Sequence, residues 1–284
     1  MWPSSYLERH LAKQWIAGPD IHDAIERARA FNRHDITAMI NYLGEEHTGR
    51  RKIDEATEKY LALIKEIRKS RVKAVISMKP TQLGLRIRPE LFEANYLKII
   101  RYAKRNSVFV WLDMEEPDTV QDTINVYLKH VKTGNTGICI QSNLKRSAKD
   151  LHLLVRHRAK IRLVKGAYTP SQSEGYHTQA SVTSNYLKLL KYLIRNDHNV
   201  LIAATHDTTM IEAAAKLAGN RKNITYAVLN GIKNIYAIEL ARSGKTVYAY
   251  IPFGEEWIAY SYRRIKEVGH LSLIMKSLFE KQPI

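Results

Sequence analysis

The sequence predicts an α/β protein whose eight parallel strands close into a TIM-like (βα)8 barrel. Short apolar and β-branched runs alternate with longer amphipathic stretches, which is the pattern of repeated βα units. There are eight such runs, the number that closes a barrel of this kind. A doubly wound open sheet is the alternative, but the regular spacing of the runs favours closure.

The eight expected strands are 36–43, 73–79, 107–114, 137–142, 161–166, 199–206, 224–230 and 246–252. Helical patterns lie between them, for example in the segments DEATEKYLALIKEIRKS and ASVTSNYLKLLKYLIRN. Residues 1–35 are expected to form N-terminal helices, and residues 36–284 the barrel and a C-terminal helix. No Gly/Pro-rich linker divides the chain, so one domain over 1–284 is predicted.

The composition favours a soluble cytoplasmic protein with anionic partners. A net charge of +17 suits anionic substrates or an acidic membrane surface, but no basic module with interleaved aromatic residues points to nucleic acid. The single cysteine, Cys139, allows no intramolecular disulfide and is expected to be a small core residue. The first residues lack the apolar core of a secretory signal, and no apolar run reaches the ~18 residues of a membrane span.

Two familiar nucleotide-binding motifs are absent from the sequence. No two glycines are separated by one residue, which excludes the Rossmann fingerprint, and there is no Walker A motif. Any nucleotide cofactor must therefore be bound in another way.

Polar residues gather at the predicted carboxyl ends of the strands, where barrel enzymes carry their chemistry. The strand IRLVKG is unusual because it contains two cations, Arg162 and Lys165, and a buried cation needs a partner or a ligand. The polar residues at six of the eight strand ends are Lys79, Asp113, Glu115, Gln141, Arg162, Lys165, Thr205, His206, Asp207 and Tyr250. Together they predict a lined site.

Purely structural roles remain open for several of these residues. Lys79 and Asp113 could form a buried structural ion pair, and His206 could be a core histidine. Trp111 and Tyr248 are expected to be packing residues. Arg263 and Arg264 could lie on a solvated helix face, although two guanidinium groups also suit a carboxylate ligand.

The motifs SMKPTQLGL, WLDMEE, IRLVKGAY, ATHD and YIPFGEEWIAYSYRRI resemble those of the proline dehydrogenases in order and spacing. ITAMINYLGEEHT resembles the first barrel strand of that family. The resemblance covers nearly the whole chain and implies a monofunctional flavoenzyme on a distorted barrel. Such an enzyme oxidises L-proline to 1-pyrroline-5-carboxylate, transfers hydride to FAD and passes electrons to a membrane quinone.

The resemblance also implies roles for individual residues. Asp113 and Arg162 are expected to be catalytic, with Arg162 near the reactive edge of the flavin. On the substrate side it implies Lys79, Tyr250, Arg263 and Arg264, the last two gripping the proline carboxylate. The further expected FAD contacts are Met114, Gln141, Lys165, Gly166, Ala167, Thr205, His206 and Glu267. No metal ligands are expected.

The chain departs from the family pattern at five positions. Gln179, Ser181 and Thr183 stand where the family commonly has a lysine and acidic residues. Ala227 replaces a frequent glutamine, and Asn143 replaces a bulky residue. These changes bear on flavin affinity rather than on the carboxylate grip. The segment LSLIMKSLFEK would suit peripheral contact with the inner face of the cell membrane, or a helix that closes the barrel.

Three other functions remain open from the residues alone. A Schiff-base aldolase would use Lys165 or Lys79 as its amine and Asp113 as proton shuttle. A metal-dependent hydrolase is weaker because the first strand ends without a pair of histidines. A degenerate barrel could bind proline without turnover.

Overall fold

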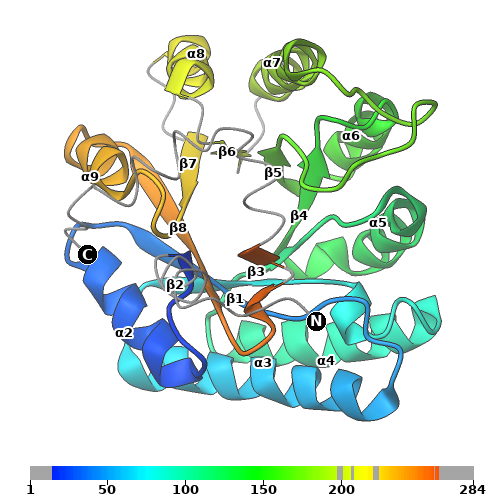
Figure 1. Ribbon diagram of the computed structural model, residues 1–284, viewed down its shortest axis with the longest axis vertical. Coiled ribbons are helices and arrows are strands. Elements are labelled where there is room, and N and C mark those ends of the chain that lie inside the picture. Colours follow the sequence, from blue (N-terminus) through cyan, green and yellow to red (C-terminus); the bar gives the residue numbers. More distant parts are fainter. Residues whose placement is uncertain (1–14, 197–200, 206–207, 220–223, 259, 262–284) are drawn as a thin grey trace.

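The computed structural model shows the closed eight-stranded barrel that the sequence predicts. It describes residues 15–196, 201–205, 208–219, 224–258 and 260–261. The strands run parallel in the order β1 to β8, and β8 pairs with β1 to close the ring. Figure 1 shows the helices arranged around these strands.

The strands occupy nearly the predicted places. Their bounds are Thr37–Tyr42 for β1, Ala74–Met78 for β2, Val110–Leu112 for β3, Thr136–Gln141 for β4, Lys160–Val164 for β5, Leu201–Ala204 for β6, Ile224–Leu229 for β7 and Thr246–Phe253 for β8. The helices are α2 (Ile21–Asn32), α3 (Arg50–Ser70), α4 (Pro89–Arg105), α5 (Val120–His130), α6 (Ser147–Arg156), α7 (Gln179–Arg195), α8 (Thr208–Ala218) and α9 (Asn234–Arg242).

Most strands end one or two residues earlier than predicted. β3 ends at Leu112 and β5 at Val164, so Asp113 and Lys165 lie just beyond the ladder rather than within it. Apolar periodicity extends past both ends because Asp113 and Met114 are buried, and Lys165 and Gly166 half-buried, in the loops above the barrel. These positions bring the side chains over the carboxyl end of the barrel.

Helix α2 explains why the barrel departs from the regular pattern. A capping box begins the helix: Asp20 accepts from the backbone N–H of Asp23, and Asp23 accepts from that of Asp20. Helix α2 packs against both β1 and β8. In a regular barrel this position is occupied by the helix that follows the eighth strand. The chain after β8 turns helical at Trp257 and packs elsewhere. Tyr260 joins a cluster with Trp15 and Leu43, and Tyr250 of β8 packs against it.

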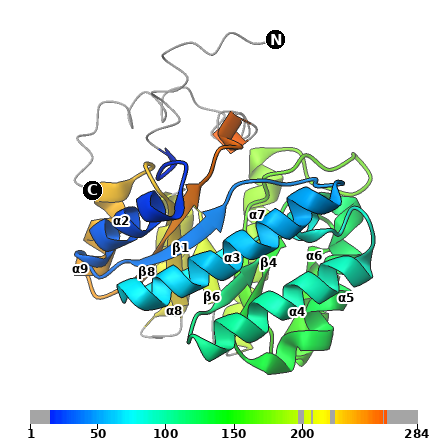
Figure 2. The same ribbon diagram turned by 90° about the horizontal axis from the view of Figure 1, so that it is seen from below.

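The core has two layers. The larger lies between the helices and the barrel, and Figure 2 shows α3 and α4 side by side on one flank of it. A smaller cluster of strand residues, Met39, Val75, Trp111 and Ala227, lies apart from it. Trp111 is fully buried because its register partner on β4 is Gly137, where a Cβ would come within 2.4 Å of the indole. The expected packing role of Trp111 is confirmed.

Among the described helices, none has the length and apolar character needed to cross a bilayer.

Candidate active site

Five side chains meet inside the carboxyl end of the barrel and form what we call the Asp113 cluster. Its members are Ser77, Lys79, Asp113, Arg162 and Tyr250. They come from β2, β3, β5 and β8 or from the residue that follows the strand. The parallel order brings these strand ends to one end of the barrel, so residues far apart in the chain converge.

Both oxygens of the Asp113 carboxylate are used within the cluster. Oδ1 accepts from the Ser77 hydroxyl at 2.5 Å and from the Arg162 guanidinium. Oδ2 accepts from the Tyr250 hydroxyl at 3.0 Å and lies 3.7 Å from the Lys79 ammonium. One carboxylate therefore holds two cations and two hydroxyls.

Asp113 is buried, but its neighbours lower its pKa by more than burial raises it. Burial raises the pKa of a carboxyl, but Arg162, Lys79 and the Ser77 hydrogen bond together hold the pKa of Asp113 below its usual value. The aspartate therefore stays ionised at neutral pH. Removing it would take from Arg162 its carboxylate partner and leave Lys79 with Glu45, 3.9 Å away. Breaking a single buried ion pair typically costs about 3–5 kcal/mol.

Lys79 has a second set of partners outside the cluster. Its ammonium donates to the Tyr168 hydroxyl at 3.3 Å, and Tyr168 donates to Glu45 at 3.0 Å. Burial lowers the pKa of Lys79, yet Tyr168 and Asp113 raise it well above its ordinary value overall. Lys79 is thus a permanent cation. Glu45 and Tyr168 were not predicted as site residues, although both closely follow a predicted strand, in the segments NYLGEE and VKGAY.

Arg162 is one of the two cations in the predicted strand IRLVKG. Its side chain is 4% exposed and points into the barrel, where it donates to the Ser77 hydroxyl at 3.0 Å and to the Met39 sulfur at 2.6 Å. The guanidinium also lies 5.8 Å from the ring centroid of Trp111 and 5.7 Å from that of Tyr250. It is therefore compensated by a charge and by two aromatic rings.

Glu115 links neighbouring loops beside the Asp113 cluster through hydrogen bonds. Its carboxylate accepts from the backbone N–H and the hydroxyl of Thr81, both at 2.8 Å. The same hydroxyl accepts from the N–H of Glu46 at 2.9 Å, and the carbonyl of Glu115 accepts from Gln141 at 2.8 Å. Burial raises the pKa of Glu115 to about 7. The loops after β1, β2, β3 and β4 are joined through this residue.

Gln141 carries an observation that fits a flavin. The side chain is 2% exposed, its amide N–H is used by Glu115, and its carbonyl oxygen is buried without a hydrogen-bond partner in the described part of the chain. An unpaired buried acceptor is costly unless a donor arrives. A flavin ring carries such an N–H, so Gln141 suits the cofactor that the resemblance implies.

The other expected cofactor residues within the described ranges lie along the same end of the barrel. Met114 and Thr205 are buried directly beyond β3 and β6, and Lys165 and Ala167 are half-buried in the loop after β5. Gly166 has φ +116°, and a Cβ there would come within 2.1 Å of Asn143. The conformation of the loop and its contact with Asn143 are therefore enough to explain a glycine at this position. The roles of all these residues stay predictions.

Four expected site residues lie outside the described residues, namely His206, Arg263, Arg264 and Glu267. The LSLIMKSLFEK segment lies outside them too. Within the ranges the structure describes, no three His, Cys, Asp or Glu side chains gather as a metal site would require.

The departures from the family pattern fall in three places. Gln179 and Ser181 begin α7, where Thr178 caps the helix by accepting from the Ser181 N–H at 3.1 Å. Ala227 lies in the inner cluster of the barrel, and Asn143 anchors the loop after β5.

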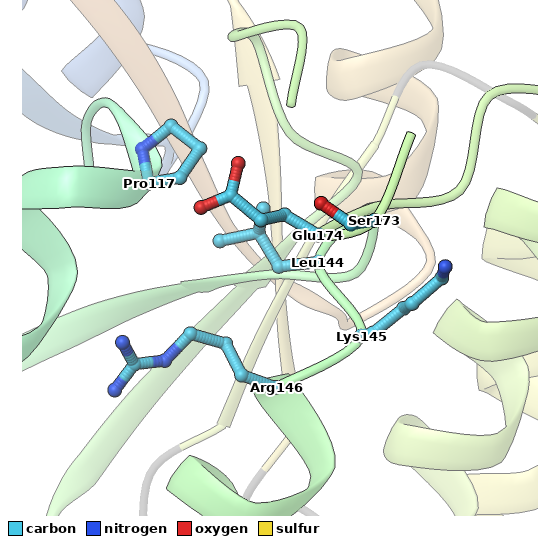
Figure 3. Close-up of a pocket in the computed structure, with 6 residues that line it drawn as sticks. All are labelled: Pro117, Leu144, Lys145, Arg146, Ser173 and Glu174. Atoms are coloured by element: carbon cyan, nitrogen blue, oxygen red, sulfur yellow. The ribbon is translucent and has the colours of Figure 1, made fainter. Parts of the chain in front are cut away.

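Figure 3 shows a surface pocket of about 210 Å³ on the rim, formed by residues that follow β3, β4 and β5. Its two cations point away from one another and are already engaged: Lys145 donates to the Gln172 carbonyl, and Arg146 to Asp150. The pocket is separate from the Asp113 cluster.

The closed barrel and its buried ionic cluster define a (βα)8 enzyme with an active site at the carboxyl ends of the strands. The family model described as proline dehydrogenase matches residues 24–276. The chain belongs to the proline dehydrogenase family, and it is an oxidoreductase that acts on proline.

Curated relatives agree with this assignment, and solved structures share the fold. Proline dehydrogenase 2 of Bacillus subtilis (strain 168) is 29% identical, over 98% of this chain and 96% of its own. Proline dehydrogenase of Deinococcus radiodurans is 31% identical, over 91% and 86%. Proline utilization A (PutA) of Bdellovibrio bacteriovorus, inactivated by N-propargylglycine, superposes with a TM-score of 0.87 at 21% identity over 97% of this chain.

PutA of Corynebacterium freiburgense gives a TM-score of 0.80 at 21% identity over 99% of this chain. The chain spans about a third of the length of these two PutA chains, 35% and 33%. At this identity the PutA likeness shows the fold alone. The predicted family and barrel are confirmed, whereas the aldolase and hydrolase alternatives are wrong. The raised pKa of Lys79 also disfavours it as a Schiff-base nucleophile.

Glu115→Gln should change how the stability depends on pH. The unfolded carboxyl loses its proton near pH 4.5 and the folded one near 7, so the folded form holds a proton that the unfolded form has lost. Wild-type stability should therefore fall as pH rises through this window, by up to about 3 kcal/mol from this group. The neutral variant should lack that fall.

Urea unfolding between pH 4.5 and 8 measures the effect. Glu239→Gln, at an exposed position on α9, is the control and should track the wild type. Parallel pH curves for wild type and Glu115→Gln would show that the proton on Glu115 is not linked to folding.

Proposed function

We propose that this chain oxidises L-proline to 1-pyrroline-5-carboxylate with FAD as hydride acceptor. The observation that carries the proposal is the Asp113 cluster, which sets two permanent cations beside an ionised carboxylate at the carboxyl end of a proline dehydrogenase family barrel. The unpaired carbonyl oxygen of Gln141 supports the cofactor. When bound, the flavin supplies a two-electron acceptor for the hydride that leaves proline.

The residues of the cluster would orient the substrate and set the local charge. Arg162, held by Asp113, would place fixed positive charge where negative charge develops during the reaction. Tyr250 donates its hydroxyl to the same carboxylate, so its ring is held in place at the site and would pack over the substrate. Lys79 would act as a cation and not as the base for the substrate amine, because its pKa is raised.

The cofactor would be held by residues that follow β3 to β6. Those within the described ranges are Met114, Gln141, Lys165, Gly166, Ala167 and Thr205. The resemblance adds His206 and Glu267.

The carboxylate of proline would be gripped by Arg263 and Arg264. The preceding residues support this placement: Tyr260 and Ser261 are buried, and Tyr260 belongs to the cluster against which Tyr250 packs. A planar guanidinium binds a carboxylate through two parallel hydrogen bonds, which suits an amino-acid substrate.

An anaerobic absorption spectrum tests the proposal directly. Purified protein loaded with FAD should lose its yellow flavin band when L-proline is added, because the ring is reduced as proline is oxidised. Trapping the product with an aminobenzaldehyde reagent identifies the pyrroline. Loaded protein that keeps its flavin band with proline would overturn the substrate, and failure to bind FAD would overturn the cofactor.

Arg264→Ala should raise KM for proline strongly while the protein stays folded. Loss of a charged hydrogen bond costs about 1.5–3 kcal/mol, or roughly 10- to 150-fold in KM. Arg101→Ala, at an exposed position on α4, is the matched control and should leave KM unchanged. Steady-state kinetics alongside a melting curve measure both. An unchanged KM for Arg264→Ala would remove the residue from the substrate site.

We further propose a cytoplasmic enzyme that meets the membrane to reduce quinone. The net charge of +17 supports contact with anionic lipid, and Lys188, Lys191 and Lys216 border the exposed Leu217 between α7 and α8. Proline-reduced protein should be reoxidised faster by a quinone in anionic vesicles than in neutral ones, and Lys188→Glu with Lys191→Glu should abolish the difference. Equal rates in both vesicles would argue against membrane contact.

A further inference from the structure

Asn143 lies two residues after the end of β4 and holds the loop that follows β5 at three points. Its backbone N–H donates to the carbonyl of Lys165 at 2.9 Å, and its side-chain amide donates to the carbonyl of Tyr168 at 2.8 Å. Its own carbonyl accepts from the N–H of Tyr176 at 2.8 Å. One residue therefore contacts the beginning, the middle and the end of the segment 165–176.

The fit between Asn143 and this segment is close. Asn143 is 7% exposed, and its side-chain oxygen has no hydrogen-bond partner within the described residues. That oxygen faces Gly166, where any Cβ would come within 2.1 Å of it. The positive φ of Gly166 and the amide of Asn143 thus go together, since a side chain at 166 would collide with that amide.

The contact continues as a short antiparallel pairing. Leu144 bridges Gly175, and the Lys145 N–H donates to the Glu174 carbonyl at 2.9 Å. Leu144, Lys145 and Glu174 appear in Figure 3. The pairing fixes the far end of the loop, and the Asn143 side chain holds its backbone further back, at Tyr168.

Tyr168 links this anchor to the Asp113 cluster. Its carbonyl is held by Asn143, while its hydroxyl accepts from Lys79 at 3.3 Å. A shift of the loop would move the Tyr168 hydroxyl away from Lys79 and would displace the backbone of Lys165, Gly166 and Ala167.

We propose that Asn143 is a positioning residue that holds the loop of residues 165–176 in its site-forming shape before any cofactor binds. The resemblance leads one to expect a bulky side chain at this position, and the small amide here donates to the half-buried Tyr168 carbonyl. The part of this inference that concerns FAD rests on the proposed function. The part that concerns the loop does not.

Asn143→Asp tests the inference with nearly unchanged side-chain size. The variant lacks the N–H donor and turns an oxygen toward the Tyr168 carbonyl. Asn135→Asp is the matched control: Asn135 also donates its amide to a backbone carbonyl, that of Ile100 at 2.9 Å, and its oxygen is also buried without a described partner. It lies at the opposite end of β4.

Hydrogen exchange of the cofactor-free protein is measured first. Asn143→Asp should speed exchange of the amides in 165–176 by about tenfold or more, while Asn135→Asp should leave them at the wild-type rate even if its melting temperature falls equally. Unchanged exchange in Asn143→Asp would overturn the proposal. If that variant does not fold, Asn143→Ala makes the same comparison with a milder change.

Titration with FAD provides the second readout. The Kd for FAD should rise by about tenfold in Asn143→Asp and stay unchanged in the control, a difference that loss of stability alone would not produce. An unchanged Kd despite faster loop exchange would overturn the link to the cofactor. If the wild type binds no FAD but the loop exchange still separates the two variants, the positioning role stands and the proposed function fails.

Discussion

The Asp113 carboxylate is the group on which the rest of the site depends. It lies inside the barrel, yet Arg162, Lys79, Ser77 and Tyr250 keep it charged and satisfied. A buried charge without partners would cost several kcal/mol. The pairing therefore lets three strands bring ionic groups to the carboxyl end of the barrel, while a separate cluster of strand residues is apolar.

Two further connections hold this cluster in place, and they act from opposite sides. Glu115 joins the loops after β1 to β4 through Thr81, and Asn143 joins the end of β4 to the loop after β5. Lys79 is linked to both connections. It lies two residues before Thr81 in the chain, and its ammonium donates to Tyr168. The positions of the cations are thus set by neutral hydrogen bonds to loop backbone as well as by charge.

The displacement of the last helix has a consequence for the substrate side. Helix α2 fills the position beside β8 and β1, so the chain after β8 is not required to pack there. Its described residues instead join Trp15 and Leu43 in a cluster beside Tyr250. The double arginine that follows lies outside the described residues, and the carboxylate grip is proposed for it from the family resemblance.

The sequence by itself determined the barrel, its eight strands and the family. The fold and the family could be predicted because apolar periodicity and the order of the motifs are local features of the chain. The predicted strand ends also correctly placed four residues together at one end of the barrel: Lys79, Asp113, Arg162 and Tyr250. Only the tertiary structure decided which partners these groups have. Ser77, Glu45 and Tyr168 were missed as site neighbours, and Asn143 was noted only as a departure, because hydrogen bonds across a barrel depend on strand register and loop geometry. Neither strand register nor loop geometry can be predicted from the spacing of residues along the chain.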